Sequence, residues 1–254
     1  MNDLFSLKGR TALVTGGSRG IGRMIAAGFL AAGARVYISA RKADACNQTA
    51  AELNEIGPCF SLPADVSTVE GAHALAAAYA QREPQLDILV NNAGAAWGAP
   101  FDEFPEKGWD KVVDLNLKAP FFLTQALTPQ LRKAAELRPA KVIHIASIDG
   151  ISINPQETYS YAASKAGLIH LTQRMALRLI QDNIVVSAIA PGAFASDMNR
   201  DARDHGTEVA ARVPAGRIGQ DEDMAGAAIY LASRAGDYVV GATLVVDGGV
   251  SFAR

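Results

Sequence analysis

The chain has 254 residues, of which 49% are hydrophobic and 20% are charged, a balance typical of a folded globular protein. The formal net charge of −2 argues against a nucleic-acid partner recognised through a basic face. The two cysteines, Cys46 and Cys59, are too few for a disulfide framework, and no Cys/His cluster has metal-ligand spacing. We therefore expect neither a nucleic-acid partner nor a bound metal.

No segment of the sequence indicates export, membrane insertion or a division into domains. The N-terminus lacks an apolar core of signal-peptide length, and no run of about 18 apolar residues occurs. No linker, low-complexity tract or repeat interrupts the chain. We expect a cytoplasmic protein with reduced thiols, no membrane partner, and a single domain over residues 1–254.

Short apolar and β-branched runs alternate with longer helical patterns along the chain. Helical patterns cover residues 20–32 and 68–81, and from 160 to 181 apolar residues recur at intervals of three and four. The candidate strands are residues 11–15, 35–40, 59–62, 87–91, 141–146, 184–189 and 243–246.

Several candidate strands are almost continuous apolar runs rather than alternating ones. This pattern is typical of strands buried on both faces, as in a parallel sheet covered by helices. Repeated strand–helix units join such strands by right-handed crossovers. The sequence therefore predicts an α/β fold, a doubly wound parallel sheet with helices on both faces.

A glycine-rich turn leads from the first predicted strand into the first predicted helix. It reads TGGSRGIG over residues 15–22, with Gly16, Gly20 and Gly22 in the spacing G-x-x-x-G-x-G. Such glycines allow a sharp turn, let a pyrophosphate approach the backbone and let helix and sheet pack closely. Amide groups at the helix start then face the phosphates. The pattern favours a nucleotide site; the alternative is a plain tight turn.

The end of the second predicted strand bears on which dinucleotide binds. Folds that prefer NAD usually carry an acidic residue there, whereas here Arg41 and Lys42 follow the strand and the first acid is Asp44. Arginine offers a fork of donors to a 2′-phosphate, and Arg19 in the glycine turn is placed to reach the same group. The sequence therefore predicts NADP(H); the alternative is that these charges are merely solvated.

Eight short motifs are spread over nearly the whole chain. They are TGGSRGIG at 15–22, AD at 64–65, NNAG at 91–94, DLNLK around Asn116, IASIDG around Ser147, YAASK at 161–165, PG at 191–192 and DGG at 247–249. Each motif is weak alone, but together they resemble those of the short-chain dehydrogenase/reductase family, in the family's order and at compatible spacings. The resemblance implies a single-domain Rossmann fold whose seven-stranded parallel sheet has the strand order 3-2-1-4-5-6-7.

The resemblance also implies the cofactor contacts. Residues 65–66 would lie near the adenine, residues 92–94 near the adenosine ribose, and residues 191–192 by the nicotinamide. Ser196 stands where the family commonly has a threonine, and its hydroxyl can make similar hydrogen bonds to the carboxamide. The implied contacts are Gly16, Ser18, Arg19, Gly20, Ile21, Gly22, Arg41, Asp65, Val66, Asn92, Ala93, Gly94, Tyr161, Lys165, Pro191, Gly192 and Ser196.

The same resemblance implies an active site of Asn116, Ser147, Tyr161 and Lys165. Hydride transfer to a ketone leaves an alkoxide that needs a proton, and a free tyrosine has a pKa of about 10. Tyr161 and Lys165 are four residues apart on one helix face, where the ammonium group would lower the tyrosine pKa. Ser147 would hydrogen-bond the substrate oxygen, and Asn116, in a mid-chain helix, would link Lys165 to solvent through water.

The stretch TYSYAASK, residues 158–165, contains a second tyrosine. Tyr159 has Ala163 rather than a lysine one turn onward, so Tyr161 is the predicted proton donor. Tyr159 is predicted to be a packing ring or to line the pocket edge. Lys165 is also placed to hold the hydroxyls of the nicotinamide ribose.

The substrate prediction depends on resemblance within the family. Residues 39–53 and 191–198 resemble 3-oxoacyl-(acyl-carrier-protein) reductases, in particular the member associated with rhamnolipid synthesis. This implies an NADPH-dependent reductase of 3-oxoacyl thioesters in fatty acid and lipid metabolism. One alternative is an NADP-dependent polyol, sugar or other secondary-alcohol dehydrogenase, and another is a nucleotide-sensing scaffold without catalysis.

Two kinds of protein partner are considered besides the small carbonyl substrate. The family resemblance implies a homotetramer with helices over about 107–132 and 160–181 between subunits, although the apolar stripe of the second helix is equally compatible with burial in one chain. The segment after the PG motif carries basic residues that would face an acidic carrier protein or an acyl thioester, namely Arg200, Arg203, Arg212 and Arg217.

Overall fold

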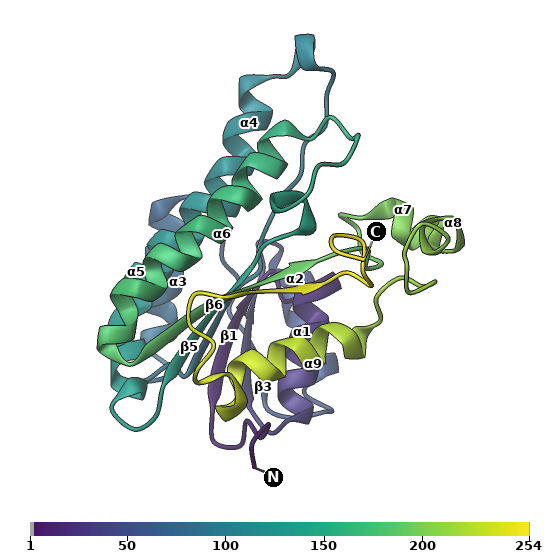
Figure 1. Ribbon diagram of the computed structural model, residues 1–254. Helices are drawn as coiled ribbons and strands as arrows, with labels where there is room; N and C mark the ends of the chain where they lie inside the picture. Colours follow the sequence, from purple (N-terminus) through teal and green to yellow (C-terminus); the bar gives the residue numbers. More distant parts are fainter. Residues whose placement is uncertain (1–2, 254) are drawn as a thin grey trace.

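The computed structural model, which describes residues 3–253, contains one sheet of seven parallel strands (Figure 1). The strand order is β3-β2-β1-β4-β5-β6-β7, which confirms the predicted order and fold class. Every predicted strand is present, with ends that differ by at most two residues. The strands are β1 (Thr11–Thr15), β2 (Arg35–Ser39), β3 (Cys59–Ser61), β4 (Ile88–Asn91), β5 (Ala140–Ile145), β6 (Ile184–Pro191) and β7 (Thr243–Val246).

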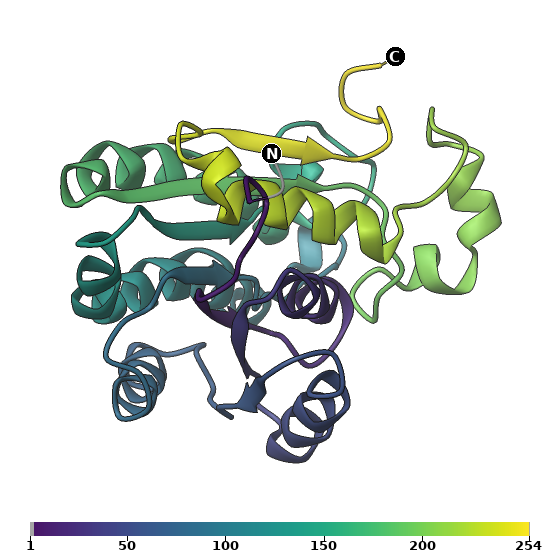
Figure 2. The same ribbon diagram turned by 90° about the horizontal axis from the view of Figure 1, so that it is seen from below.

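Two layers of helices cover the sheet, one on each face (Figure 2). α1, α2 and α9 bury Phe29, Cys46 and Met224 against one face, and α3, α5 and α6 bury Tyr79 and Leu127 against the other. Removing such large apolar side chains from water is the main stabilisation of both layers. The helices are α1 (Gly20–Ala31), α2 (Ala43–Leu53), α3 (Val69–Ala80), α4 (Glu106–Val113), α5 (Ala119–Ala135), α6 (Tyr159–Leu179), α7 (Arg200–Asp204), α8 (Gly206–Ala210) and α9 (Asp221–Ala232). None of the helices in residues 3–253 has both the length and the apolar character that crossing a membrane requires.

The helix predicted over residues 107–132 is interrupted. Between α4 and α5 lies a π-helical turn, Asp114–Lys118, which adds a residue to the helix without ending it. The sequence DLNLK holds neither glycine nor proline, so nothing in the pattern reveals the turn. Asn116, expected in a regular helix, lies in this turn and is 1% exposed.

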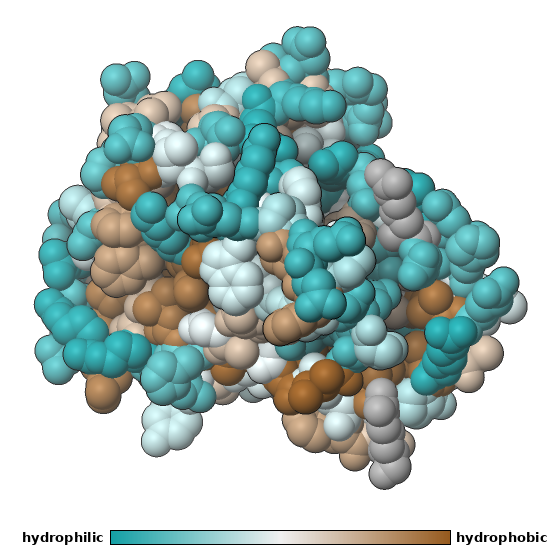
Figure 3. Space-filling model, turned by 90° about the horizontal axis from the view of Figure 1, so that it is seen from above, coloured by the Kyte–Doolittle hydropathy of each residue, from teal (hydrophilic) through white to brown (hydrophobic). Residues whose placement is uncertain are grey.

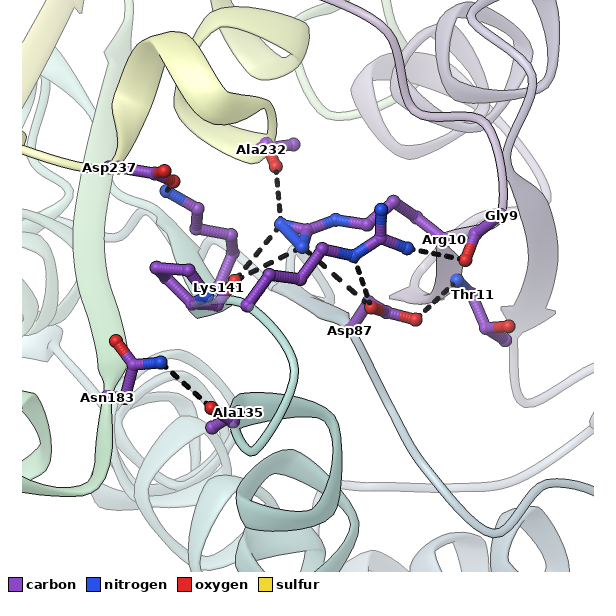
Figure 4. A network of polar contacts seen from close by, with 11 residues as sticks. Gly9, Arg10, Thr11, Asp87, Ala135, Lys141, Asn183, Ala232 and Asp237 are labelled. Carbon is purple, nitrogen blue, oxygen red and sulfur yellow. Dashed lines mark hydrogen bonds and ion pairs between the residues drawn. The ribbon is translucent and has the colours of Figure 1, made fainter.

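A buried group of charged residues lies at the amino ends of the central strands (Figure 4). Asp87, just before β4, accepts the Thr11 amide at 2.9 Å and lies 3.8 Å from Arg10 and 3.5 Å from Arg138. Burial lowers the pKa of Arg10, and the charge of Asp87 acts in the opposite direction. The Asp87 carboxylate is therefore the counter-charge that offsets the cost of burying Arg10.

The same group joins segments that are distant in the sequence. Arg10 donates to the carbonyl oxygen of Pro139 at 3.1 and 3.2 Å and to that of Ala232 at 3.2 Å. Lys141, at the start of β5 and 1% exposed, pairs with Asp237 at 2.7 Å. These contacts fix the starts of β1 and β5 against the end of α9.

We predict that Asp87→Asn strongly destabilises the fold. The substitution removes the charge that faces Arg10 while the arginine stays buried, and breaking a buried pair costs about 3–5 kcal/mol. Urea titration should show this loss in the free energy of unfolding. The matched control is Asp182→Asn, whose carboxylate also faces two arginines, but at the surface, and whose loss should stay below about 1 kcal/mol. Equal losses in the two variants would contradict this account.

Candidate active site

The predicted site residues gather at the carboxyl edge of the sheet. The glycine turn follows β1, residues 92–94 follow β4, Ser147 follows β5 and Pro191 ends β6. Ligands of doubly wound sheets bind outside this edge. Tyr161 and Lys165 join the group from the first two turns of α6.

The glycine turn brings the loops after β1 and β4 into contact. Gly16 and Gly20 have φ angles of +64° and +52°, in the region that favours glycine. A Cβ atom on Gly16 would lie 2.7 Å from the side chain of Asn92, and one on Gly22 would overlap the carbonyl oxygen of Gly16. Larger residues at these positions would force the two loops apart.

The start of α1 is suited to bind a phosphate group. Its N-cap, Arg19, makes no side-chain capping bond, and its first turn has no acidic residue. The first amides of α1 therefore have no side-chain acceptor, at the positive end of the helix dipole. The turn thus fits the pyrophosphate of a dinucleotide.

Thr15, which the sequence prediction did not include among the site residues, holds the loop after β4. Its hydroxyl accepts the amides of Asn92 at 3.0 Å and Ala93 at 3.1 Å and donates to the Val90 carbonyl at 3.3 Å. Asn92 in turn donates to the carbonyl oxygens of Thr15 at 2.8 Å and Gly16 at 3.3 Å. A hydroxyl at the last residue of a strand, within the glycine motif, is the signal that could have identified it.

The predicted cofactor contacts that follow β1 and β3 also make contacts within the fold. The Ser18 carbonyl accepts the Thr49 hydroxyl at 3.0 Å, and Ile21 packs against the core beneath α1. Asp65 accepts the amide two residues onward at 3.0 Å. Val66 is 5% exposed and packs in the core, so its side chain contributes to the core beneath this edge of the sheet.

The residues predicted near the nicotinamide come from the loop after β6. The Gly192 amide donates to Val246 at 2.9 Å, which holds the end of β6 beside β7. The Cβ atom of Ser196 lies 3.2 Å from the place where a Cβ on Gly20 would stand, so Ser196 lies against the glycine turn. A Cβ on Gly94 would lie 3.2 Å from Asn116, so this glycine lies beside the candidate active-site residues.

Ser147 and Tyr161 are brought together by β5 and α6. The Ser147 hydroxyl accepts the Asp149 amide at 3.1 Å, which caps a short 3₁₀ turn, and it also hydrogen-bonds the Tyr161 side chain. A Cβ on Gly150 would lie 2.7 Å from the backbone of Lys165, so glycine lets this turn pack on α6. Ser147 therefore both caps a turn and contacts Tyr161.

Lys165 is anchored on β5 near the Tyr161 ring. Its Nζ donates to the Ile145 carbonyl at 2.7 Å and lies 5.5 Å from the ring centroid of Tyr161. Burial raises the pKa of Tyr161 to about 12, against the opposing effect of the Ser147 hydrogen bond, and Asp149 raises it further. Burial lowers the pKa of Lys165 to about 8, opposed by Asp149. The lowered tyrosine pKa expected from Lys165 is thus not found, because burial dominates and Ile145 holds the ammonium group.

Asn116 joins the loop after β4 to helix α6. Its Oδ1 accepts the Ala95 amide at 2.8 Å, and its Nδ2 donates to the Ala95 carbonyl at 2.9 Å and to the Ser164 hydroxyl at 3.1 Å. Ser164 directly precedes Lys165 in α6. The structure thus gives Asn116 a positioning contact, while its link to solvent through water stays a prediction.

Tyr159 belongs to an aromatic cluster at the start of α6. Its ring packs edge-on against Phe101 and Phe104, with 5.6 Å between the centroids in both pairs. Its hydroxyl donates to Glu157 at 2.9 Å, and the same carboxylate oxygen accepts the Phe101 amide at 3.1 Å. Tyr159 therefore fastens the segment before α4 to α6, as a packing ring does.

The two arginines predicted to bind a 2′-phosphate have different surroundings. Arg41 is exposed after β2 and has no ion pair or side-chain hydrogen bond to any other part of residues 3–253. Arg19 pairs with Asp197 at 2.6 Å. Arg41 is thus open to an anionic ligand, whereas Arg19 already has a carboxylate partner.

His144, to which the sequence assigned no role, lies buried near Lys165. Its Nδ1 is 2.9 Å from the Thr172 hydroxyl, which itself donates to the Leu168 carbonyl at 2.7 Å, so Nδ1 carries the proton. Burial and, secondarily, the charge of Lys165 lower the pKa of His144 to about 3. The imidazole is therefore neutral at pH 7.

Known proteins match this chain over nearly its whole length. The family model described as enoyl-(acyl carrier protein) reductase matches residues 16–251. The rhamnolipids biosynthesis 3-oxoacyl-[acyl-carrier-protein] reductase of Pseudomonas aeruginosa is 47% identical over 98% of this chain and 99% of that relative. The 5-keto-D-gluconate 5-reductase of Escherichia coli is 37% identical over 100% of both chains. The solved Pseudomonas aeruginosa RhlG/NADP active-site complex, 47% identical, superposes with a TM-score of 0.95 over 99% of this chain and 100% of that one.

We predict that His144 makes the fold sensitive to mild acid. Its pKa is about 3 in the folded protein and 6.5 in an ordinary histidine, so the unfolded chain binds one more proton between these values. Stability is complete above pH 6.5 and falls as the pH drops, by about 2 kcal/mol at pH 5. Urea titrations at pH 7 and pH 5 should show this loss in the wild type and a smaller loss in His144→Gln. The same loss in both proteins would exclude His144 as the responsible group.

Proposed function

This chain belongs to the short-chain dehydrogenase/reductase family, and on that premise we propose that it is an NADPH-dependent reductase of 3-oxoacyl thioesters. As a member it is an oxidoreductase that acts between ketone and alcohol groups. The observation that carries the proposal is the meeting of Ser147, Tyr161 and Lys165 at the same edge of the sheet as the glycine turn.

NADP(H) is the proposed cofactor, and it would supply the hydride. The uncapped start of α1 fits its pyrophosphate, and the exposed, unpaired Arg41 fits its 2′-phosphate. No acidic residue after β2 opposes that phosphate before Asp44. The RhlG relative, solved as a complex with NADP, supports the same assignment.

The chain's own residues would act on one oxygen atom and one proton. Ser147 would donate a hydrogen bond to the ketone oxygen, and Tyr161 would give its phenol proton to the same atom as the alkoxide forms. With a pKa of about 12, Tyr161 is protonated at neutral pH, as a proton donor must be. Lys165, with a pKa of about 8, is mostly charged at pH 7, and its ammonium group would hold the hydroxyls of the nicotinamide ribose.

A 3-oxoacyl thioester is the proposed substrate, with rhamnolipid synthesis as the process it would feed, because of the 47% identical relative. Ile151 and Ile153 in the segment after Ser147, and Met198 beside Gly94, are exposed apolar side chains that would contact an acyl chain. The surface seen from above shows hydrophobic residues between hydrophilic ones (Figure 3). The similarity to a 5-keto-D-gluconate reductase supports the alternative, a sugar-acid or polyol substrate.

A cytoplasmic homotetramer is the proposed assembly. The exposed apolar side chains of Trp109 in α4, Phe121 in α5 and Leu177 in α6 support contacts between subunits along these helices.

A carrier-protein partner is a weaker proposal. Of the four basic residues expected to face it, Arg203 and Arg217 form ion pairs with neighbouring carboxylates, Arg212 is exposed, and the side chain of Arg200 lies outside the described part. Paired arginines are less available to an acidic partner, so the thioester proposal does not depend on them.

We predict that Tyr161→Phe abolishes carbonyl reduction and that Tyr159→Phe does not. Each variant removes one hydroxyl from the start of α6. Loss of the proton donor should lower kcat by about 10²–10⁴-fold, whereas Tyr159 loses only its bond to Glu157 and the enzyme should keep most of its rate. NADPH oxidation with acetoacetyl-CoA and with a panel of ketones and sugar acids measures both.

Three results would overturn parts of the proposal. Wild-type rates in Tyr161→Phe would remove the assigned proton donor. Reduction of sugar acids but not of acyl thioesters would favour the alternative substrate class. Binding of NADPH without reduction of any carbonyl compound would favour the nucleotide-sensing scaffold.

We predict that Arg41→Asp reverses the cofactor preference. The new carboxylate repels a 2′-phosphate and accepts a bond from a 2′-hydroxyl, so the Kd of NADPH should rise at least about tenfold while that of NADH stays equal or falls. Fluorescence titration measures both constants. Arg132→Asp, an equal charge change at an exposed position of α5, should leave them unchanged. Equal wild-type affinities for the two cofactors would contradict the role of Arg41.

A further inference from the structure

One carboxylate connects the glycine turn to the loop after β6. Asp197 Oδ2 lies 2.6 Å from Nη1 of Arg19, and its Oδ1 lies 2.7 Å from Nη1 of Arg203 in α7. Arg19 and Asp197 are 178 positions apart in the sequence. Because Arg19 is one of the two arginines predicted to bind a 2′-phosphate, Asp197 and this phosphate would share one guanidinium group.

A bound anion can readily replace Asp197 as the partner of Arg19, because the ion pair between them is weak. The two side chains are 71% and 49% exposed, and ion pairs at the surface contribute little because water and salt screen them. A phosphate monoester carries more negative charge than a carboxylate and three strong acceptor oxygens. A 2′-phosphate is therefore a better partner for the guanidinium group than the carboxylate it replaces.

The segment that contains Asp197 leaves the body of the fold through a narrow base. Phe194, 2% exposed, forms a β-bridge with Gly219, whose amide donates to Ala193 at 2.8 Å. Beyond this base, α7 and α8 lie at the edge of the molecule (Figure 1). A cavity of about 170 Å³ beside the ion pair leaves room for movement and is lined in part by Arg19, Arg23, Ser196, Asp197, Arg203 and Asp221.

We propose that Asp197 competes with the 2′-phosphate of NADP(H) for Arg19. In the ligand-free protein Asp197 forms ion pairs with both Arg19 and Arg203. When NADP(H) binds, its 2′-phosphate replaces Asp197 as the partner of Arg19, and Asp197 keeps its ion pair with Arg203. Residues 195–218 then lose this tie to the glycine turn. The inference depends on the proposed NADP(H) specificity, and it makes the position of residues 195–218 depend on which cofactor is bound.

The test compares the Kd of NADPH and NADH, by fluorescence titration, in the wild type, Asp197→Asn, Arg19→Gln and the double variant. Asp197→Asn should bind NADPH about two- to fivefold more tightly, the effect of removing an exposed ion-pair partner, with NADH unchanged. Arg19→Gln should weaken NADPH binding, and in its background Asp197→Asn should have no effect. The matched control is Asp201→Asn, which removes a carboxylate of α7 that forms no ion pair with Arg19, and it should change neither constant.

The outcomes separate this inference from the proposed function. If the wild type prefers NADPH but Asp197→Asn binds it no more tightly than Asp201→Asn, the competition is refuted and the cofactor assignment stands. The same conclusion follows if Asp197→Asn still tightens NADPH binding in the Arg19→Gln background. If the wild type binds both cofactors equally, the cofactor assignment fails and the competition fails with it.

A second measurement follows the loop directly. Adenosine 2′,5′-bisphosphate carries the phosphate that should displace Asp197, and adenosine 5′-monophosphate does not. At saturation the bisphosphate should give faster amide hydrogen exchange over residues 196–204 than the monophosphate in the wild type, and Asp197→Asn should exchange at the faster rate with either ligand. Equal exchange with both ligands in the wild type would show that the loop is not coupled to the 2′-phosphate.

Discussion

All strands of the sheet run in one direction, and this constraint places their carboxyl ends at a single edge. The turns that leave β1, β4, β5 and β6 meet there, and α6 brings Tyr161 and Lys165 to the same place. The amino ends of the strands, with the loops that lead into them, lie at the opposite edge. There the Arg10 and Asp87 charges fix the loops to one another. One edge is thus held by buried ions, and the other keeps polar groups available for a ligand.

The parts of this arrangement that follow from local pattern are predictable from the sequence. Continuous apolar runs predict the strands, and the spacing of the glycines predicts the turn after β1. The missed features depend on contacts between distant segments. The bond from Lys165 to Ile145 and the raised pKa of Tyr161 follow from burial, which no spacing of residues expresses. The single sheet supports the prediction of one domain over residues 1–254, which stays a prediction.

Several polar side chains of the site also hold backbone segments or loops in place. Ser147 caps the turn after β5, Asn116 holds the loop after β4, and Arg19 pairs with the loop after β6. A substitution at such a residue changes the positions of backbone segments as well as the chemistry. Binding constants and unfolding energies measured together distinguish these two effects, because a lost ligand contact leaves the unfolding energy of the ligand-free protein unchanged.

The π turn at Asp114–Lys118 makes the number of residues in this segment as important as their identity. One added residue rotates the rest of a helix by about 100° relative to an uninterrupted one. With this rotation, Asn116 faces Ala95 and Ser164 while Leu123 and Leu127 in α5 still lie in the core. Removing or adding a single residue here would change the angle between the amide of Asn116 and the buried side chains of α5. Length polymorphism at this point would therefore alter the active site without altering any residue of it.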